Sequence, residues 1–72
     1  MTKKKTYKPI LLSALRESRN LTQVELSKEL KVSHSLVGLW ESGKRNPSLN
    51  MAKKVASYFN MPVESIRFSN KA

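Results

Sequence analysis

The sequence has no cysteine and no aspartate among its 72 residues. Without cysteine there is no disulfide and no thiolate metal site, and without aspartate there is no Ser-His-Asp triad. The longest apolar run covers only Ile10 to Leu12, far short of the roughly 20 residues that cross a membrane. The lysine-rich start is not followed by the apolar region of a signal peptide. We therefore expect no membrane segment, and the absence of cysteine fits a reducing cytoplasm.

Groups that support catalysis are equally scarce. The five glutamates are scattered along the expected helices, and His34 is the sole histidine, with no cysteine or carboxylate at ligand spacing. No glycine-rich phosphate loop is present. We expect no enzyme activity, no cofactor and no metal site.

Charge is the strongest bulk signal. Fourteen lysines and arginines against five glutamates give a formal net charge of +9, which attracts polyanions at long range. Nucleic acid is the first candidate partner, followed by an anionic membrane or an acidic protein, while a solvated charge excess that aids solubility is the simpler alternative. The length allows one domain, which we expect over residues 9–68, between a basic tail at 1–8 and a short tail at 69–72.

The first helix is expected over residues 9–19. Pro9 suits the first helical position because its missing N–H would be unbonded there, and Asn20 suits the left-handed stop. Helical spacing predicts one buried face, made of Leu11, Ala14, Leu15 and Ser18.

A helix over residues 49–60 is expected after the cap residue Ser48. Pro62 then opens a final short turn, and no strand is predicted. The apolar spacing indicates that the core at this end contains Leu49, Ala52, Val55, Ala56, Phe59, Val63, Ile66 and Phe68.

Between these helices lie two short amphipathic segments joined by a tight turn. In the segment over residues 23–30, Thr22 and Glu25 have the spacing of a capping box, and Leu26 and Leu30 face the core. The segment over residues 34–42 is expected to be capped by Ser33 and to end at Gly43. Its inner stripe is Val37 and Trp40, with Val32 just ahead of it. Two such helices are typical of a helix-turn-helix, which usually places its second helix in the DNA major groove.

This pattern closely resembles the lambdoid phage repressor and Cro family of helix-turn-helix proteins, the XRE type. The resemblance covers roughly residues 11–66. It is carried by Thr22-Gln23-x-x-Leu26, Val32-Ser33, Val37-x-x-Trp40-Glu41-x-Gly43 and Pro47-Ser48. It implies an all-α fold, a compact four- to five-helix lambda-repressor-like DNA-binding domain with a central helix-turn-helix.

The resemblance also implies roles for individual residues. Base-facing positions would be His34, Ser35, Gly38 and Leu39. Phosphate contacts would come from Gln23, Lys31, Ser33, Lys44, Arg45 and Asn46. Arg16 and Glu41 occupy positions that pair in family members to brace the first helix against the third.

Two departures from the family pattern affect these expectations. Lys31 stands in the turn where the family often has glycine, and a non-glycine residue in the left-handed region costs about 1 kcal/mol. The third helix also lacks the Arg, Lys, Asn or Gln side chains that form paired hydrogen bonds to base edges. Its outer face is instead expected to carry Leu36, Gly38 and Leu39. With Val24 nearby, these leucines could form a protein-contact patch.

Two functions therefore stay open. The first is a small phage-type transcription regulator that binds double-stranded operator DNA in a lysogeny switch, within the nucleoid of a bacterial host cell. The second is an anti-repressor that binds the cognate phage repressor, as in Cro-like modulators of repression, to which the chain looks similar. A homodimer is usual for the family, yet no heptad or long apolar extension marks a dimer interface.

Overall fold

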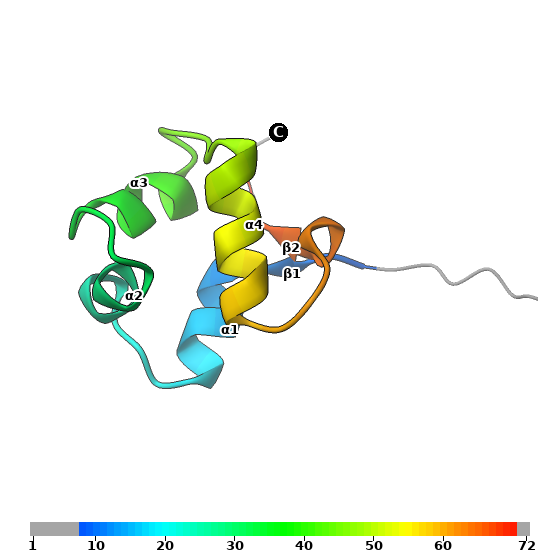
Figure 1. Ribbon diagram of the computed structural model, residues 1–72, viewed down its shortest axis with the longest axis horizontal. Coiled ribbons are helices and arrows are strands. Elements are labelled where there is room, and N and C mark those ends of the chain that lie inside the picture. The colour runs from blue at the N-terminus through cyan, green and yellow to red at the C-terminus, as the bar shows by residue number, and fades with distance from the viewer. Residues whose placement is uncertain (1–7, 71–72) are drawn as a thin grey trace, which may run out of the picture.

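The computed structural model describes residues 8–70, and most of this part of the chain is helical (Figure 1). The predicted tail over residues 1–8 lies, apart from Lys8, outside the described residues, as do the last two residues of the chain. The elements in chain order are β1 (Ile10–Leu11), α1 (Leu12–Ser18), α2 (Gln23–Leu30), α3 (Leu36–Ser42), α4 (Leu49–Tyr58), a 3-10 turn η1 (Val63–Ser65) and β2 (Ile66–Arg67).

The helices enclose one small apolar core, to which α1, α2, α3, α4 and β2 all contribute. The helices α1 to α4 around this core confirm the expected α-helical fold class. The buried members of the core are Leu12, Leu26, Leu30, Val37, Trp40, Val55, Ala56, Phe59 and Ile66. In residues 8–70, no helix is both long and apolar enough to pass through a membrane.

The two short strands correct the prediction that the chain contains none. β1 pairs in parallel with β2, with Ile10 opposite Ile66 and Leu11 opposite Arg67. Leu11 has an extended backbone (φ −62°, ψ 140°), so α1 begins at Leu12 rather than near Pro9. The later start rotates the buried face: Leu12 is fully buried, whereas the predicted core positions Ala14 and Ser18 are exposed.

α2 follows the sequence prediction closely. The Thr22 hydroxyl accepts a hydrogen bond from the Glu25 backbone N–H at 3.0 Å, and a Glu25 carboxylate oxygen accepts one from the Thr22 N–H at 2.8 Å. The helix ends at Leu30, and the next residue, Lys31, has a left-handed backbone (φ 59°, ψ 44°). The chain turns there although a side chain in this conformation is unfavourable.

α3 and α4 differ from their predicted bounds at one end each. Residues before Leu36 form a turn in which the Leu36 N–H donates to the Ser33 carbonyl at 3.0 Å, so α3 starts two residues later than expected. Ser35, not Ser33, is the residue that precedes the helix, and its side chain forms no capping hydrogen bond. The Ser48 cap of α4 is present, but Leu49 is 65% exposed and is not part of the core. α4 ends at Tyr58 rather than at Asn60.

Candidate nucleic-acid interface

The turn between α2 and α3 is fixed by a buried hydroxyl. Ser27 is fully buried, and its hydroxyl lies 2.9 Å from the Gln23 carbonyl and 3.3 Å from the His34 carbonyl. This side chain therefore connects α2 to the residues that enter α3. The Val32 N–H also donates to the Ser27 carbonyl at 3.0 Å. The relative placement of the two helices is thus set by local hydrogen bonds as well as by core packing.

An ion pair connects α1 to α3. The Arg16 guanidinium donates through Nε to Oε2 of Glu41 at 2.8 Å and through Nη2 to Oε1 at 3.1 Å. The two side chains are only 11% and 9% exposed. Arg16 also donates through Nη1 to the Leu21 carbonyl at 2.7 Å. Its hydrogen bond to Glu41 raises the pKa of Arg16, against the opposing effect of burial. The contact is bidentate, the geometry of strong arginine–carboxylate pairs.

Gln23 extends this pair to the start of α2. Its amide Nε2 donates to Oε1 of Glu41 at 2.9 Å. One carboxylate therefore accepts hydrogen bonds from α1 and α2 while it is itself part of α3. Sequence reasoning identified Arg16 and Glu41 as a pair and Gln23 as a phosphate contact, but it did not predict that the three would form one network. The network requires side-chain geometry that spacing along the chain does not contain.

The residues predicted to face bases do not all occupy the same environment. His34 and Ser35 are exposed in the turn before α3, whereas Gly38 and Leu39 are partly buried. Gly38 lies beneath the Gln23 side chain, because a Cβ placed there would be 3.0 Å from Gln23 Oε1. Thus Gly38 is closer to α2 than the predicted reading face implied.

The residues predicted to contact phosphate flank α3 at both ends. Lys31 and Ser33 are exposed just before it, and an exposed loop after it holds Lys44, Arg45 and Asn46. This loop is anchored to α3, because the Lys44 and Arg45 N–H groups donate to the Leu39 carbonyl at 3.1 and 3.2 Å. Gly43 permits the turn with its left-handed backbone (φ 79°). Basic side chains are thereby held on both sides of one short helix.

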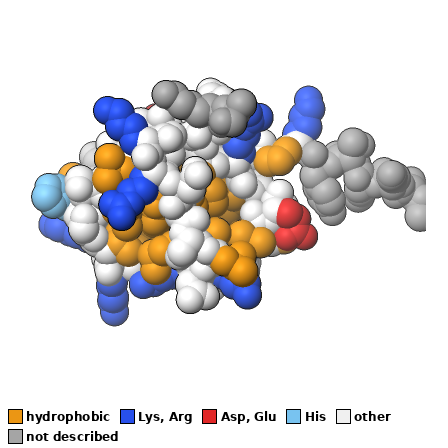
Figure 2. All heavy atoms as spheres, turned by 90° about the horizontal axis from the view of Figure 1, so that it is seen from above, with side chains coloured by type: hydrophobic (Ala, Val, Ile, Leu, Met, Phe, Trp, Pro, Cys, Tyr) orange, Lys and Arg blue, Asp and Glu red, His pale blue; other side chains and the backbone are white. Residues whose placement is uncertain are grey.

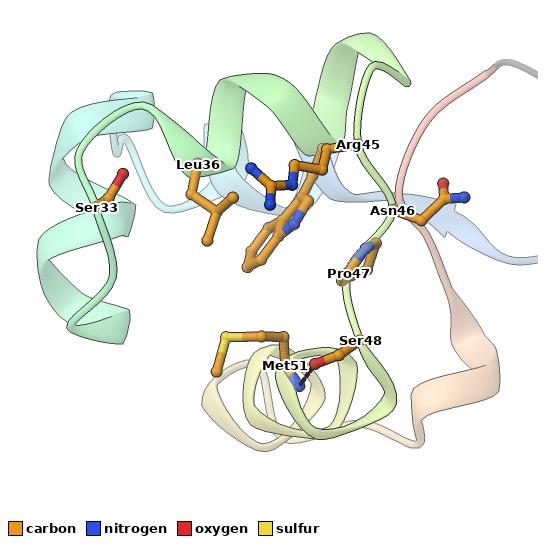
Figure 3. A pocket seen from close by; sticks show the side chains of 8 residues that line it. Ser33, Leu36, Arg45, Asn46, Pro47, Ser48 and Met51 are labelled. Atoms are coloured by element: carbon orange, nitrogen blue, oxygen red, sulfur yellow. Dashed lines mark hydrogen bonds between the residues drawn. The ribbon is translucent and has the colours of Figure 1, made fainter.

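Leu36 was predicted to be part of an apolar outer patch. It is partly buried and packs against the core, and it lines a pocket of about 380 Å³ between α3, the loop and α4. In Figure 3 the side chains of Leu36, Arg45 and Met51 are directed toward this space, while Asn46 points away. Figure 2 shows apolar side chains at the centre of one face and Lys and Arg side chains around its margin. Val24, by contrast, is 42% exposed on α2, as predicted.

A capped α2, a tight turn and an α3 braced by Glu41 define a helix-turn-helix protein. A family model described as helix-turn-helix matches residues 12–66, and the chain belongs to this family. The matched segment includes all four helices.

Curated relatives cover the same segment. The chain is 34% identical over 55 residues to the HTH-type transcriptional activator BcrR of Enterococcus faecalis, which is 76% of this chain but 27% of that protein. It is 42% identical over 55 residues to the uncharacterized HTH-type transcriptional regulator MJ0272 of Methanocaldococcus jannaschii, covering 76% and 83% of the two chains. An uncharacterized HTH-type transcriptional regulator of Archaeoglobus fulgidus is 40% identical over 55 residues, with 76% and 78% covered.

Proposed function

We propose that this protein is a transcription regulator that binds operator DNA with α3 in the major groove. The observation that carries the proposal is the network in which Glu41 of α3 accepts hydrogen bonds from Arg16 and Gln23. The network connects α3 to both α1 and α2, so the orientation of α3 is fixed before any partner binds. A preset helix of this kind can enter the groove with little loss of conformational freedom. The names of the curated relatives support the same function.

The positions of the basic side chains support contacts with the DNA phosphates on both sides of the groove. Lys31 and Ser33 precede α3, and Lys44, Arg45 and Asn46 follow it, all of them exposed. Phosphate contacts of this type position a protein on the duplex and supply most of its affinity. The net charge of +9 adds long-range attraction to the same partner.

Base recognition in this proposal rests on few groups. His34 and Ser35 can form single hydrogen bonds, and Leu39 can contact a thymine methyl. None of them forms the bidentate pair that discriminates a base by about 1–3 kcal/mol. We therefore expect modest sequence preference on top of strong, salt-dependent affinity.

The biological setting is part of the proposal and rests on the phage repressor and Cro resemblance. In that setting the protein acts in a lysogeny switch, in the cytoplasm of a bacterial host, and residues 9–68 form the functional domain. Binding to two half-sites would require a homodimer, with recognition helices about 34 Å apart. A two-fold arrangement in the preferred duplex would report such a dimer.

Operator binding is tested by selecting duplexes from a random pool with the full chain. We expect a selected duplex to bind more tightly than its scrambled version at about 150 mM salt. Arg45→Gln should weaken both duplexes and lower the slope of log K against log salt by about 0.9, because one phosphate contact is lost. Lys53→Gln, which removes an exposed charge from α4, should leave the slope unchanged. Equal affinity for selected and scrambled duplexes would remove the proposal.

The second candidate is an anti-repressor that binds the cognate repressor protein. It is favoured by the partly buried Leu36 and Leu39 on α3 and the exposed Val24 on α2, apolar residues that cannot form paired hydrogen bonds to base edges. Native mass spectrometry with the cognate repressor should show a complex that Leu39→Lys disrupts. The control is Leu49→Lys on α4, which makes the same change at a leucine that is 65% exposed and lies away from α3 in the sequence. A complex that tolerates Leu39→Lys as well as the control would exclude these apolar residues as the interface.

A further inference from the structure

The geometry of α3 does not explain why residue 38, in the middle of this helix, is a glycine. Glycine in a helix interior is unfavourable compared with alanine. Of the two glycines in the sequence, only Gly43 has a positive φ, so the backbone at position 38 suits any residue. The reason must lie in the space around Gly38.

That space is occupied by the end of the Gln23 side chain. A Cβ at position 38 would lie 3.0 Å from Oε1, 3.5 Å from Cδ and 3.8 Å from Nε2 of Gln23. The closest of these distances is shorter than ordinary van der Waals contact. A methyl group at position 38 would therefore displace the end of the Gln23 side chain by a few tenths of an ångström from its place over α3.

The same amide is held from a second direction. Its Nε2 donates to Oε1 of Glu41 at 2.9 Å, and Glu41 is fixed by the bidentate contact with Arg16. A glutamine amide nitrogen carries two N–H groups, so one N–H remains for a ligand while the other binds Glu41. The exposed position of Gln23 at the start of α2 leaves this group accessible to the surface that flanks α3.

We propose that Gly38 is a positioning residue that seats the Gln23 amide for a phosphate contact, and that it does not itself contact a base. Glu41 orients the amide from one side, and the bare backbone of Gly38 provides the surface on which it rests. This inference rests on the proposed function, because the ligand of the amide is a DNA phosphate. It replaces the expectation that Gly38 faces a base.

The test is a double-mutant cycle between positions 23 and 38. Gly38→Ala should weaken DNA binding about 3- to 10-fold, the effect of one lost hydrogen bond, and equally for selected and scrambled duplexes. Gln23→Ala should cause a similar loss, and the double variant should bind no more weakly than either single variant. The thermal midpoint of Gly38→Ala should equal or exceed that of the parent, because alanine favours helix. Additive losses in the double variant would overturn the proposal.

A readout without DNA separates this inference from the proposed function. Gln23 is the single glutamine in the sequence, so selective ¹⁵N-glutamine labelling reports its side-chain amide alone. Gly38→Ala should shift both Nε2 proton resonances, whereas Ser42→Ala, one turn further along α3, should not. If no duplex binds but the resonances move, the proposed function fails, while the role of Gly38 in positioning the Gln23 amide is supported. If the resonances do not shift in Gly38→Ala, Gly38 does not position the Gln23 amide.

Discussion

Replacing Trp40 with alanine should leave most of the protein unfolded at 25 °C. Trp40 is 2% exposed at the centre of the core, and it packs edge-to-face on Phe68, with ring centroids 5.9 Å apart at 83°. Truncation of a buried aromatic residue of this size costs about 3–5 kcal/mol. A core this small supplies a net stability of only about 3–5 kcal/mol. The loss is therefore comparable to the whole net stability of the domain. Far-UV circular dichroism should show little helix at 25 °C and no cooperative thermal transition.

Trp40→Phe is the control for this variant. It keeps an apolar ring against Phe68 and leaves a smaller cavity, so the thermal transition should persist at a lower midpoint. A Trp40→Ala protein that melted with the same midpoint as Trp40→Phe would contradict the central place of this side chain.

Removing the Glu41 carboxylate should have the second-largest effect. Glu41→Ala leaves Arg16 charged in a site where it is only 11% exposed. It also removes the acceptor of the Gln23 amide. Removing one partner of a buried pair costs about 3–5 kcal/mol, and among residues 8–70 the charge of Arg16 would keep only the exposed Glu17 carboxylate at 3.6 Å. Urea denaturation followed by circular dichroism should show a large fall in the free energy of unfolding.

The paired variant Arg16→Met with Glu41→Leu separates the pair from the packing. Replacing both charges with apolar groups of similar size is often nearly neutral, so this protein should be clearly more stable than Glu41→Ala. It should still bind DNA less well, because Gln23 has lost the group that orients its amide. A double variant less stable than Glu41→Ala would show that the net contribution of the ion pair itself is large.

The elements that the sequence predicts best are those set by neighbouring residues. The bounds of α2 follow from Thr22, Glu25 and the turn at Lys31, all of which act within four residues of a helix end. The strands could not be predicted in this way. Ile10 pairs with Ile66, which is remote in sequence, and a two-residue segment has no periodicity. The later start of α1 follows from that pairing, because Ile10 and Leu11 are drawn into an extended conformation.

The site shows the same division between local and distant causes. The family resemblance placed Gln23, Lys44 and Arg45 near the third helix, and in the structure they lie at the start of α2 and in the loop that follows α3. The orientation of Leu36 was not predictable, because it depends on the loop and α4, which together with α3 form the pocket that Leu36 lines. The relation between Gly38 and Gln23 was also hidden, since a residue without a side chain has no pattern that points to its neighbour.

The pairing of β1 with β2 gives the domain a mechanical property. Because the strands are parallel and hydrogen-bonded in register, the first and last elements of the fold are fastened to each other. A pull on either end would load the same few hydrogen bonds and the buried Ile66 beneath them. α3 is coupled to the same end of the fold, because Phe68 follows β2 directly and packs edge-to-face on Trp40 of α3. Tension that separated the two strands would therefore also pull on a contact that holds α3 in the core.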